Sequence, residues 1–222
     1  MSNRTTHINT ILFDWDGTLA DSAALQLNAF QQTFAELGLP FPVEVYEMGY
    51  SPNWYRTYEA LELPKDQWPK ADELWLRHYG DQTAQLIEGA AETLVTLHEN
   101  GYQLGVVSSG SEARVCREIE RAQVADVFAT VICNEHIENR KPHPEGLHAA
   151  LDRLLAVAAE SAYVGDAPED IEMGKRAGVL TVAVRSAYPC SSKLAAAGPD
   201  IYLETLSELT RYFSRRSDSL PV

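Results

Sequence analysis

Two aspartates, Asp14 and Asp16, stand one residue apart at the end of a short apolar run, directly before Gly17. An ionised carboxylate beside a divalent cation can attack phosphorus and form an aspartyl-phosphate. A second carboxylate nearby can give a proton to the leaving alkoxide and later take one from the attacking water. The spacing therefore predicts phosphoryl transfer with Asp14 as the nucleophile and Asp16 as the acid/base. Gly17 allows the sharp turn that points both carboxylates at one pocket.

Three further residues could handle a phosphate, and they follow two other apolar segments. The hydroxyl of Ser108 can hold one phosphoryl oxygen, and the backbone N–H of Ser109, in a loop that opens a helix, can hold another. The Lys141 ammonium binds phosphate as a point charge, and it would also help to keep Asp14 ionised. Each of these also has a simpler interpretation, since serines often cap helices and most lysines lie at the surface.

A metal site is expected from the carboxylates. Mg²⁺ prefers oxygen ligands, and Asp14, Asp16 and Asp166 follow two predicted strands that a parallel sheet would place close together. Asp170 lies four residues after Asp166, in the first turn of the next predicted helix. The sequence has no cluster of cysteine and histidine that would indicate zinc instead.

The elements that must position these residues alternate along the chain. Apolar runs predict strands at 8–13, 102–107, 128–133, 161–166 and 179–184, with a short edge strand at 200–204. Amphipathic spacing and capping residues predict helices at 21–38, 111–122, 144–157, 168–178 and 205–213. This alternation predicts an α/β fold with a parallel sheet covered by helices. In such sheets the ligand crevice lies beyond the carboxyl ends of the strands, where the candidate residues stand.

Residues 20–88 interrupt the alternation. The segment shows no clear strand, and it contains Trp54, Trp68 and Trp75 together with several prolines between short helical stretches. We expect an all-helical insert that leaves the core after the first strand and rejoins it near Glu88 and Gly89. The predicted domains are a core formed by residues 1–20 and 88–222 and a cap formed by residues 21–87.

Composition narrows the class of protein. The chain has 222 residues and a formal net charge of −14, which opposes binding to nucleic acid or anionic lipid. Its three cysteines have no CxxC spacing, which fits a reducing compartment. No apolar run reaches the ~18 residues that span a bilayer. We expect a cytoplasmic protein, a monomer or a small homo-oligomer, with no nucleic-acid or membrane partner.

Four segments carry a family resemblance: "FDWDGTLADS" (13–22), "VVSSG" (106–110), "RKPHPE" (140–145) and "VGDAPEDIEMGKRAG" (164–178). Their order and spacing resemble the four motifs of the haloacid dehalogenase superfamily. More narrowly, they are similar to its phosphoglycolate phosphatase and β-phosphoglucomutase branch, in which a helical cap follows the first motif. The resemblance extends from Ile8 to about Phe213.

This resemblance implies a Rossmann-like core with an inserted helical cap. It implies that Mg²⁺ is held by the Asp14 side chain, the Asp16 main-chain carbonyl and the Asp166 side chain. Asp170 would be a supporting carboxylate.

The resemblance also implies that Ser108 supplies the phosphate-binding hydroxyl and that Lys141 bridges the nucleophile and the phosphate. Members that cleave carbon–halogen bonds lack the second aspartate of the first motif, so Asp16 indicates phosphoryl transfer. The expected function is a Mg²⁺-dependent phosphatase for a small phosphorylated metabolite, phosphoglycolate-like or a sugar phosphate, acting through an aspartyl-phosphate. A phosphomutase of the β-phosphoglucomutase type and a non-catalytic regulatory protein are the alternatives.

The cap should recognise the leaving group. The stretch "GYSPNWYRTYEA" (49–60) places four aromatic residues around Arg56, which is the expected specificity residue. The other interpretation is that these aromatic residues form the hydrophobic core of the cap itself.

Overall fold

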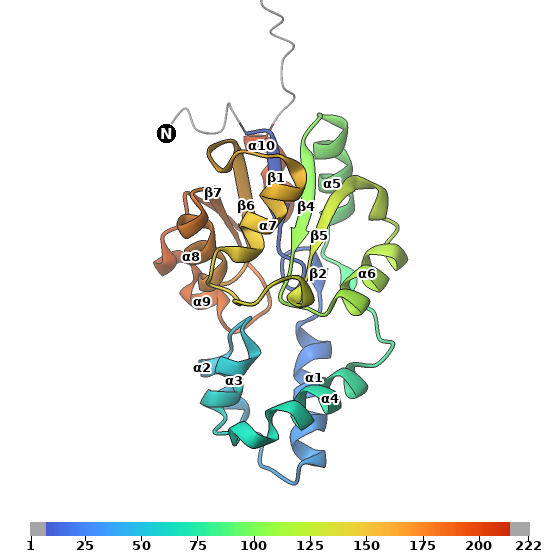
Figure 1. Ribbon diagram of the computed structural model, residues 1–222, viewed down its shortest axis with the longest axis vertical. Coiled ribbons are helices and arrows are strands. Elements are labelled where there is room, and N and C mark those ends of the chain that lie inside the picture. The colour runs from blue at the N-terminus through green and yellow to red at the C-terminus, as the bar shows by residue number, and fades with distance from the viewer. Residues whose placement is uncertain (1–7, 214–222) are drawn as a thin grey trace, which may run out of the picture.

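The computed structural model describes residues 8–213 and shows a six-stranded sheet with a smaller helical domain beyond one of its edges (Figure 1). The strands are β1 (Thr10–Phe13), β4 (Gln103–Val107), β5 (Phe128–Ile132), β6 (Ser161–Gly165), β7 (Leu180–Val184) and β8 (Ile201–Leu203). Their order is β5-β4-β1-β6-β7-β8, and every neighbouring pair is parallel. The predicted α/β fold with a parallel sheet is confirmed.

Strand β1 lies between β4 and β6, and all four of its residues are buried, as is typical of a central parallel strand. Phe13 is in register with Val106 of β4 on one side and with Val164 of β6 on the other. The residues that follow these three strands therefore meet at one edge, which faces the helical domain (Figure 1).

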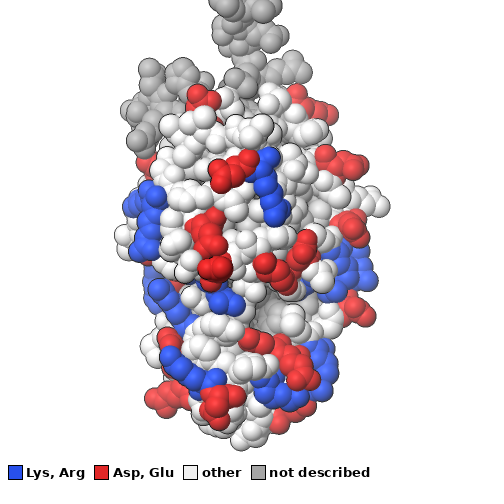
Figure 2. All heavy atoms as spheres, in the orientation of Figure 1, with Lys and Arg blue, Asp and Glu red and all other residues white. Residues whose placement is uncertain are grey.

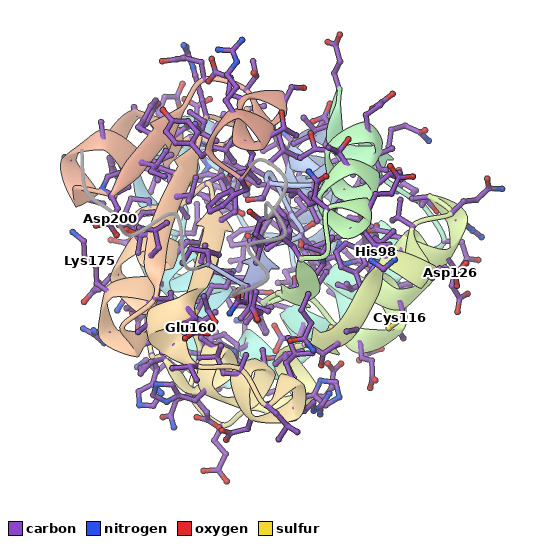
Figure 3. The ribbon with its side chains drawn as sticks, turned by 90° about the horizontal axis from the view of Figure 1, so that it is seen from above. His98, Cys116, Asp126, Glu160, Lys175 and Asp200 are labelled. Atoms are coloured by element: carbon purple, nitrogen blue, oxygen red, sulfur yellow. The ribbon has the colours of Figure 1, made fainter. Side chains whose placement is uncertain are left out.

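Helices cover both faces of the sheet, as the view from above shows (Figure 3). One face carries α5 (Ala90–Glu99), α6 (Glu112–Arg121) and α10 (Leu209–Tyr212), and the other carries α7 (Glu145–Leu154) and α8 (Pro168–Ala177), with α9 (Ser191–Leu194) beside α8. Successive side chains of a strand point to opposite faces, so Ile11 and Phe13 pack into the first layer and Leu12 into the second. The sheet is thus buried on both sides, which fixes the position of its carboxyl edge.

The helical domain consists of α1 (Ala23–Glu36), α2 (Val43–Gly49), α3 (Trp54–Ala60) and α4 (Trp68–Tyr79). It has its own cluster of buried residues, which is rich in aromatic side chains such as Phe30, Phe34, Tyr46 and Tyr58. The cluster does not merge with the layers of the sheet domain. We call residues 21–87 the cap, and these boundaries remain a prediction.

The insert differs from the sequence prediction in one respect. It begins and ends with two short strands, β2 (Ala20–Asp21) and β3 (Gln85–Leu86), which pair antiparallel. The N–H of Ile87 also donates to the carbonyl of Leu19, at 2.9 Å. A two-residue strand has too few positions to show a period in the sequence.

The surface carries charges of both signs. On the face shown in Figure 2, acidic and basic side chains are mixed over both domains, so the net charge of −14 is not gathered into one patch there. Within residues 8–213, no helix is both long and apolar enough to cross a membrane.

Candidate active site

The carboxyl edge of the sheet brings together the residues that follow its three central strands. Asp14 follows β1, Ser108 follows β4 and Asp166 follows β6, and all three are buried. The parallel register of β1 with β4 and β6 places the ends of these strands next to one another, on the side of the cap. The structure therefore places the predicted nucleophile, phosphate-binding serine and metal ligand side by side.

Lys141 reaches the same point from the loop after β5. Its Nζ lies 2.7 Å from Asp14 Oδ1 and 2.8 Å from Asp170 Oδ1. Burial alone would lower the pKa of Lys141, but the charges of the two aspartates outweigh it and raise that pKa. The ammonium therefore stays protonated beside Asp14.

Asp170 holds Lys141 in place. Its Oδ2 accepts the backbone N–H of Ala167 at 3.0 Å, and its Oδ1 accepts the hydroxyl of Tyr163 at 3.2 Å. The carboxylate is fully buried at the start of α8. These contacts fix its orientation toward Lys141, which fits the supporting role that the family resemblance implied.

The acidic cluster has less positive than negative charge. Asp14, Asp166 and Asp170 each offer an oxygen within 4.8 Å of the others. Burial raises the pKa of Asp14 to about 7, with Asp170 adding to the effect and Lys141 opposing it. Burial and the charges of Asp14 and Asp170 likewise raise the pKa of Asp166 well above its usual range. One ammonium does not balance three carboxylates, and hard oxygen donors suit a divalent cation such as Mg²⁺, so the residues present fit a metal.

Gly17 makes the turn that brings Asp14 and Asp166 together. Its φ is +80°, a left-handed conformation that favours glycine. A Cβ at this position would clash with the carboxylate of Asp166. The turn therefore needs glycine both for its backbone angle and for the close approach to the metal site.

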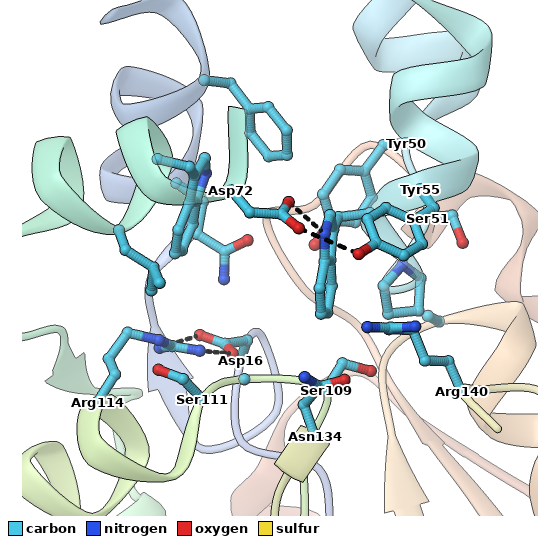
Figure 4. A pocket seen from close by; sticks show the side chains of 18 of the residues that line it. Asp16, Tyr50, Ser51, Tyr55, Asp72, Ser109, Ser111, Arg114, Asn134 and Arg140 are labelled. Carbon is cyan, nitrogen blue, oxygen red and sulfur yellow. Dashed lines mark hydrogen bonds and ion pairs between the residues drawn. The ribbon is translucent and has the colours of Figure 1, made fainter. Parts of the chain in front are cut away.

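Asp16 is held by an arginine that the sequence did not indicate. Arg114 Nη1 donates to Asp16 Oδ1 at 2.9 Å and Nη2 donates to Oδ2 at 2.6 Å (Figure 4). The Ser22 hydroxyl also donates to Asp16 Oδ1, at 2.6 Å. Burial would raise the pKa of Asp16, but the charge and hydrogen bonds of Arg114 outweigh it and hold that pKa below its usual value. The side chain of Asp16 lies outside the three-carboxylate cluster. A metal contact from its main-chain carbonyl remains a prediction.

A buried network continues from Arg114 to the cap. Arg114 Nη1 also contacts Glu118 Oε2 at 3.1 Å, one turn further along α6. Glu118 accepts the Trp15 indole N–H at 2.6 Å and the hydroxyl of Tyr79, at the end of α4, at 2.7 Å. The helical spacing of the sequence carries a signal for this pair. Arg114 and Glu118 lie four residues apart, on the same buried side of α6 as Val115 and Ile119.

The loop after β4 presents backbone groups to the cavity. Ser109, Gly110 and Ser111 line it, just before α6 begins. The Ser108 hydroxyl accepts the Gly110 N–H at 3.0 Å and is not on the cavity wall. The N–H groups at the start of α6 suit a phosphate, whereas a direct phosphate contact from Ser108 remains a prediction.

A cavity of about 330 Å³ lies between this edge and the cap (Figure 4). Its core wall includes Asp14, Asp16, Ser109, Gly110, Ser111, Arg114, Asn134, Glu135, Arg140, Asp166 and Ala167. Its cap wall includes Gln26, Phe30, Tyr50, Ser51, Pro52, Trp54, Tyr55, Tyr58, Asp72, Trp75 and Leu76. The volume is at the lower end of the range for small-molecule sites, so it suits a small metabolite.

The structure does not bring Arg56 to this cavity. Its side chain is about half exposed and pairs with Glu169 of α8 at 3.8 Å. Its neighbours Tyr50, Trp54 and Tyr55 do line the cavity, and Tyr58 both lines it and belongs to the core of the cap. The expected segment therefore faces the site, but its aromatic side chains rather than its arginine form the wall.

Comparisons with known proteins agree with this geometry. Residues 11–184 match a family described as haloacid dehalogenase-like hydrolase. The curated pyrophosphatase PpaX of Listeria monocytogenes is 33% identical over 207 residues, which cover 91% of this chain and 94% of that protein.

Solved structures share the fold at lower identity. A predicted phosphoglycolate phosphatase from Haemophilus somnus is 20% identical with a TM-score of 0.82, covering 92% of this chain and 97% of that one. A β-phosphoglucomutase from Clostridium difficile is 17% identical with a TM-score of 0.76, covering 94% and 96%. At these identities the similarity concerns the fold alone.

Proposed function

Because the chain belongs to the haloacid dehalogenase-like hydrolase family, we propose that it is a Mg²⁺-dependent phosphatase acting on a small phosphate monoester through an aspartyl-phosphate on Asp14. The family resemblance seen in the four motifs is thereby confirmed, and a protein named as a phosphatase of pyrophosphate is among its relatives. The substrate class, the intermediate and the metal are the parts that we propose.

One observation carries the proposal most strongly. Asp14 is buried at the carboxyl edge of the sheet with Lys141 at 2.7 Å, and Asp166 and Asp170 complete an oxygen cluster beside it. Buried carboxylates at such close range are costly without a compensating cation. A nucleophilic carboxylate next to a cation site and a fixed ammonium is an arrangement suited to phosphoryl transfer.

The residues divide the reaction between them. Lys141 holds Asp14 Oδ1, so Oδ2 is the oxygen that forms a bond to phosphorus while the bond from phosphorus to the leaving oxygen breaks. The N–H group of Ser109 and the ammonium of Lys141 bind the phosphoryl oxygens. Water then attacks the phosphorus, which frees Asp14 and releases phosphate. Mg²⁺, held by Asp14 and Asp166, would supply positive charge for the phosphoryl oxygens.

The pairing of Asp16 with Arg114 bears on its role as acid/base. A carboxylate that is kept ionised by a bidentate arginine is a weak proton donor. Donation to a poor alkoxide leaving group therefore requires Asp16 to leave Arg114 first, whereas a good leaving group needs no such step.

The test is hydrolysis of an aryl phosphate with and without Mg²⁺. Wild-type protein should release phosphate only with Mg²⁺, and Asp14→Asn should abolish the release. Asp126→Asn, at an exposed carboxylate far from the site (Figure 3), is the matched control and should keep full activity. Full activity of Asp14→Asn would exclude the mechanism.

The same preparation separates the alternatives. Conversion of a sugar phosphate to its isomer without release of phosphate would replace the phosphatase by a phosphomutase. Absence of metal-dependent turnover on every phosphate ester offered would favour the regulatory alternative.

A further inference from the structure

The cap side of the cavity has an unusual distribution of charge. Among the described residues that form this wall, Asp72 alone carries a formal charge, and the others are mostly aromatic or apolar. No lysine, arginine or histidine of the cap reaches the cavity within residues 8–213. An anionic leaving group would therefore meet a negative charge and aromatic rings where it needs cations.

Asp72 is fixed at the cavity wall by neutral donors. Its Oδ1 accepts the Trp54 indole N–H at 2.9 Å and the Tyr58 hydroxyl at 3.1 Å, and its Oδ2 accepts the Tyr55 hydroxyl at 3.1 Å (Figure 4). It makes no ion pair with a basic side chain in the part of the chain that the structure describes, whereas its neighbour Glu73 pairs with Lys70. Its negative charge is thus held in position and left without a bonded cation.

Two arginines of the core also line the cavity, and their contacts differ. Arg114 is bound to Asp16 and Glu118. The guanidinium carbon of Arg140 lies 4.5 Å from the ring centroids of both Trp54 and Tyr55, so it stacks on the two residues that hold Asp72. Among the described residues of the cavity wall, Arg140 is the basic side chain without an ion pair, so the experiment must separate its effect from that of Asp72.

We propose that Asp72 is a specificity residue that restricts the leaving group to small organic moieties without negative charge, so that inorganic pyrophosphate and anionic monoesters are disfavoured. The inference rests on the proposed phosphatase function, and it concerns which phosphate esters the cap accepts. Aromatic rings favour an apolar leaving group by contact, and Asp72 acts against an anionic one by repulsion. The activity in the name of the relative PpaX accordingly does not extend to this chain.

The test uses two esters of the same shape. 4-Nitrobenzyl phosphate and 4-carboxybenzyl phosphate differ in the charge of one planar group, and the CH₂ group insulates the leaving oxygen from it. Wild-type protein should prefer the nitro ester in kcat/KM by about tenfold, the size of one like-charge repulsion at an intermediate dielectric constant. Asp72→Asn, which keeps a side-chain oxygen as acceptor, should bring the ratio close to one by raising kcat/KM for the carboxy ester.

Glu73→Gln is the matched control, because Glu73 is an exposed acid next to Asp72 on the same helix. It should leave the ratio unchanged. Pyrophosphate should be a poorer substrate than the nitro ester for wild-type protein. A wild-type ratio near one, or a preference for the carboxy ester or pyrophosphate, would overturn the proposal. A preference for the carboxy ester would indicate that Arg140 sets the charge preference.

Two measurements keep this outcome separate from that of the phosphatase proposal. If Asp72→Asn does not fold, the wild-type ratio still tests the charge preference, and a ratio near one overturns the proposal. If no ester is hydrolysed, the phosphatase proposal fails, and calorimetric titration of Asp14→Asn with the two esters then decides the charge preference from binding. Equal binding of both esters would overturn the inference even in a protein without turnover.

Discussion

At the scale of single residues, the buried carboxylates make the stability of the metal-free protein depend on pH. The pKa of Asp14 is raised by burial to about 7, from 3.8, so protonated Asp14 is favoured in the folded state. The contribution of such a group is fully present below its unfolded pKa and is lost as pH rises through the folded value. Asp166 shifts in the same direction, and the lowered pKa of Asp16 acts only in more acidic solution.

We therefore expect the melting temperature in the presence of EDTA to fall between about pH 5.5 and about pH 8. Added Mg²⁺ should raise it more at the higher pH, because the carboxylates are then ionised and bind the cation. Differential scanning calorimetry measures both effects. A melting temperature that rises or stays level over this pH interval without metal would contradict the expectation that ionised Asp14 and Asp166 destabilise the metal-free protein.

Arg114 gives a second prediction at this scale. Arg114→Ala leaves the buried carboxylates of Asp16 and Glu118 without their cation, and breaking a buried pair typically costs about 3–5 kcal/mol. Urea denaturation should show a loss of this size in the free energy of unfolding.

Arg117→Ala is the control on the same helix. Arg117 donates to the Gly80 carbonyl and faces the exposed Asp81, so its loss should cost about 1 kcal/mol. Equal effects of the two substitutions would show that the Arg114 network contributes little to stability.

The predictability of the site follows from how each residue is positioned. Asp14, Ser108 and Asp166 could be predicted because each directly follows a strand, and a parallel sheet gathers strand ends at one edge. Arg114 could not be assigned to Asp16, since the contact joins residues 98 positions apart and depends on the angle of α6. The position of Asp72 at the cavity wall likewise could not be predicted, because it depends on the orientation of aromatic rings on α3 that the sequence does not determine.

At the scale of elements, the strands predicted from apolar runs and the long helices predicted from apolar spacing agree with the structure, because each pattern extends over several residues. β2 and β3 were missed, as two residues carry no period. Their position matters for the cap, because the segments that enter and leave the cap pair with each other through β2 and β3. Gly89 follows shortly after β3, at the start of α5, and has a φ of +77°.

Gly89→Ala should destabilise the protein by more than the cost of placing an alanine in a left-handed conformation. The new Cβ would clash with the Ser207 hydroxyl, in addition to the backbone cost of about 1 kcal/mol. Gly101→Ala is the matched control, because Gly101 has a φ of +85° but no heavy atom near the added Cβ. Thermal unfolding compares them.

Adding Ser207→Ala should relieve the clash and return Gly89→Ala to the level of Gly101→Ala. If the double variant is no more stable than Gly89→Ala, the clash is not the cause of the loss.

At the scale of the whole molecule, the two domains should open with different free energies. The central strands β1 and β6 are buried along their whole length, whereas α2 and α3 have seven residues each and few buried ones. Helices this short depend on packing for their stability. Amides of α2 and α3 should therefore exchange through partial opening, and those of β1 and β6 only through global unfolding.

Native-state hydrogen exchange at increasing denaturant measures these free energies. The longer α1, with 14 residues, serves as the comparison within the cap. Exchange of α2 and α3 at the global free energy would show that cap and core unfold as one unit.

The pairing of Ala20 with Leu86 has a consequence for how such a molecule can diversify. The whole cap is one insertion in the chain of the sheet domain, and the two ends of this insertion are paired. The entropy lost on closing such a loop depends only weakly on the length of the insertion. A different segment can be inserted between the same two residues without changing the order of the strands in the sheet. The residues of the sheet edge and the residues that select the substrate can therefore change independently in evolution, because the cap can be replaced as one continuous segment.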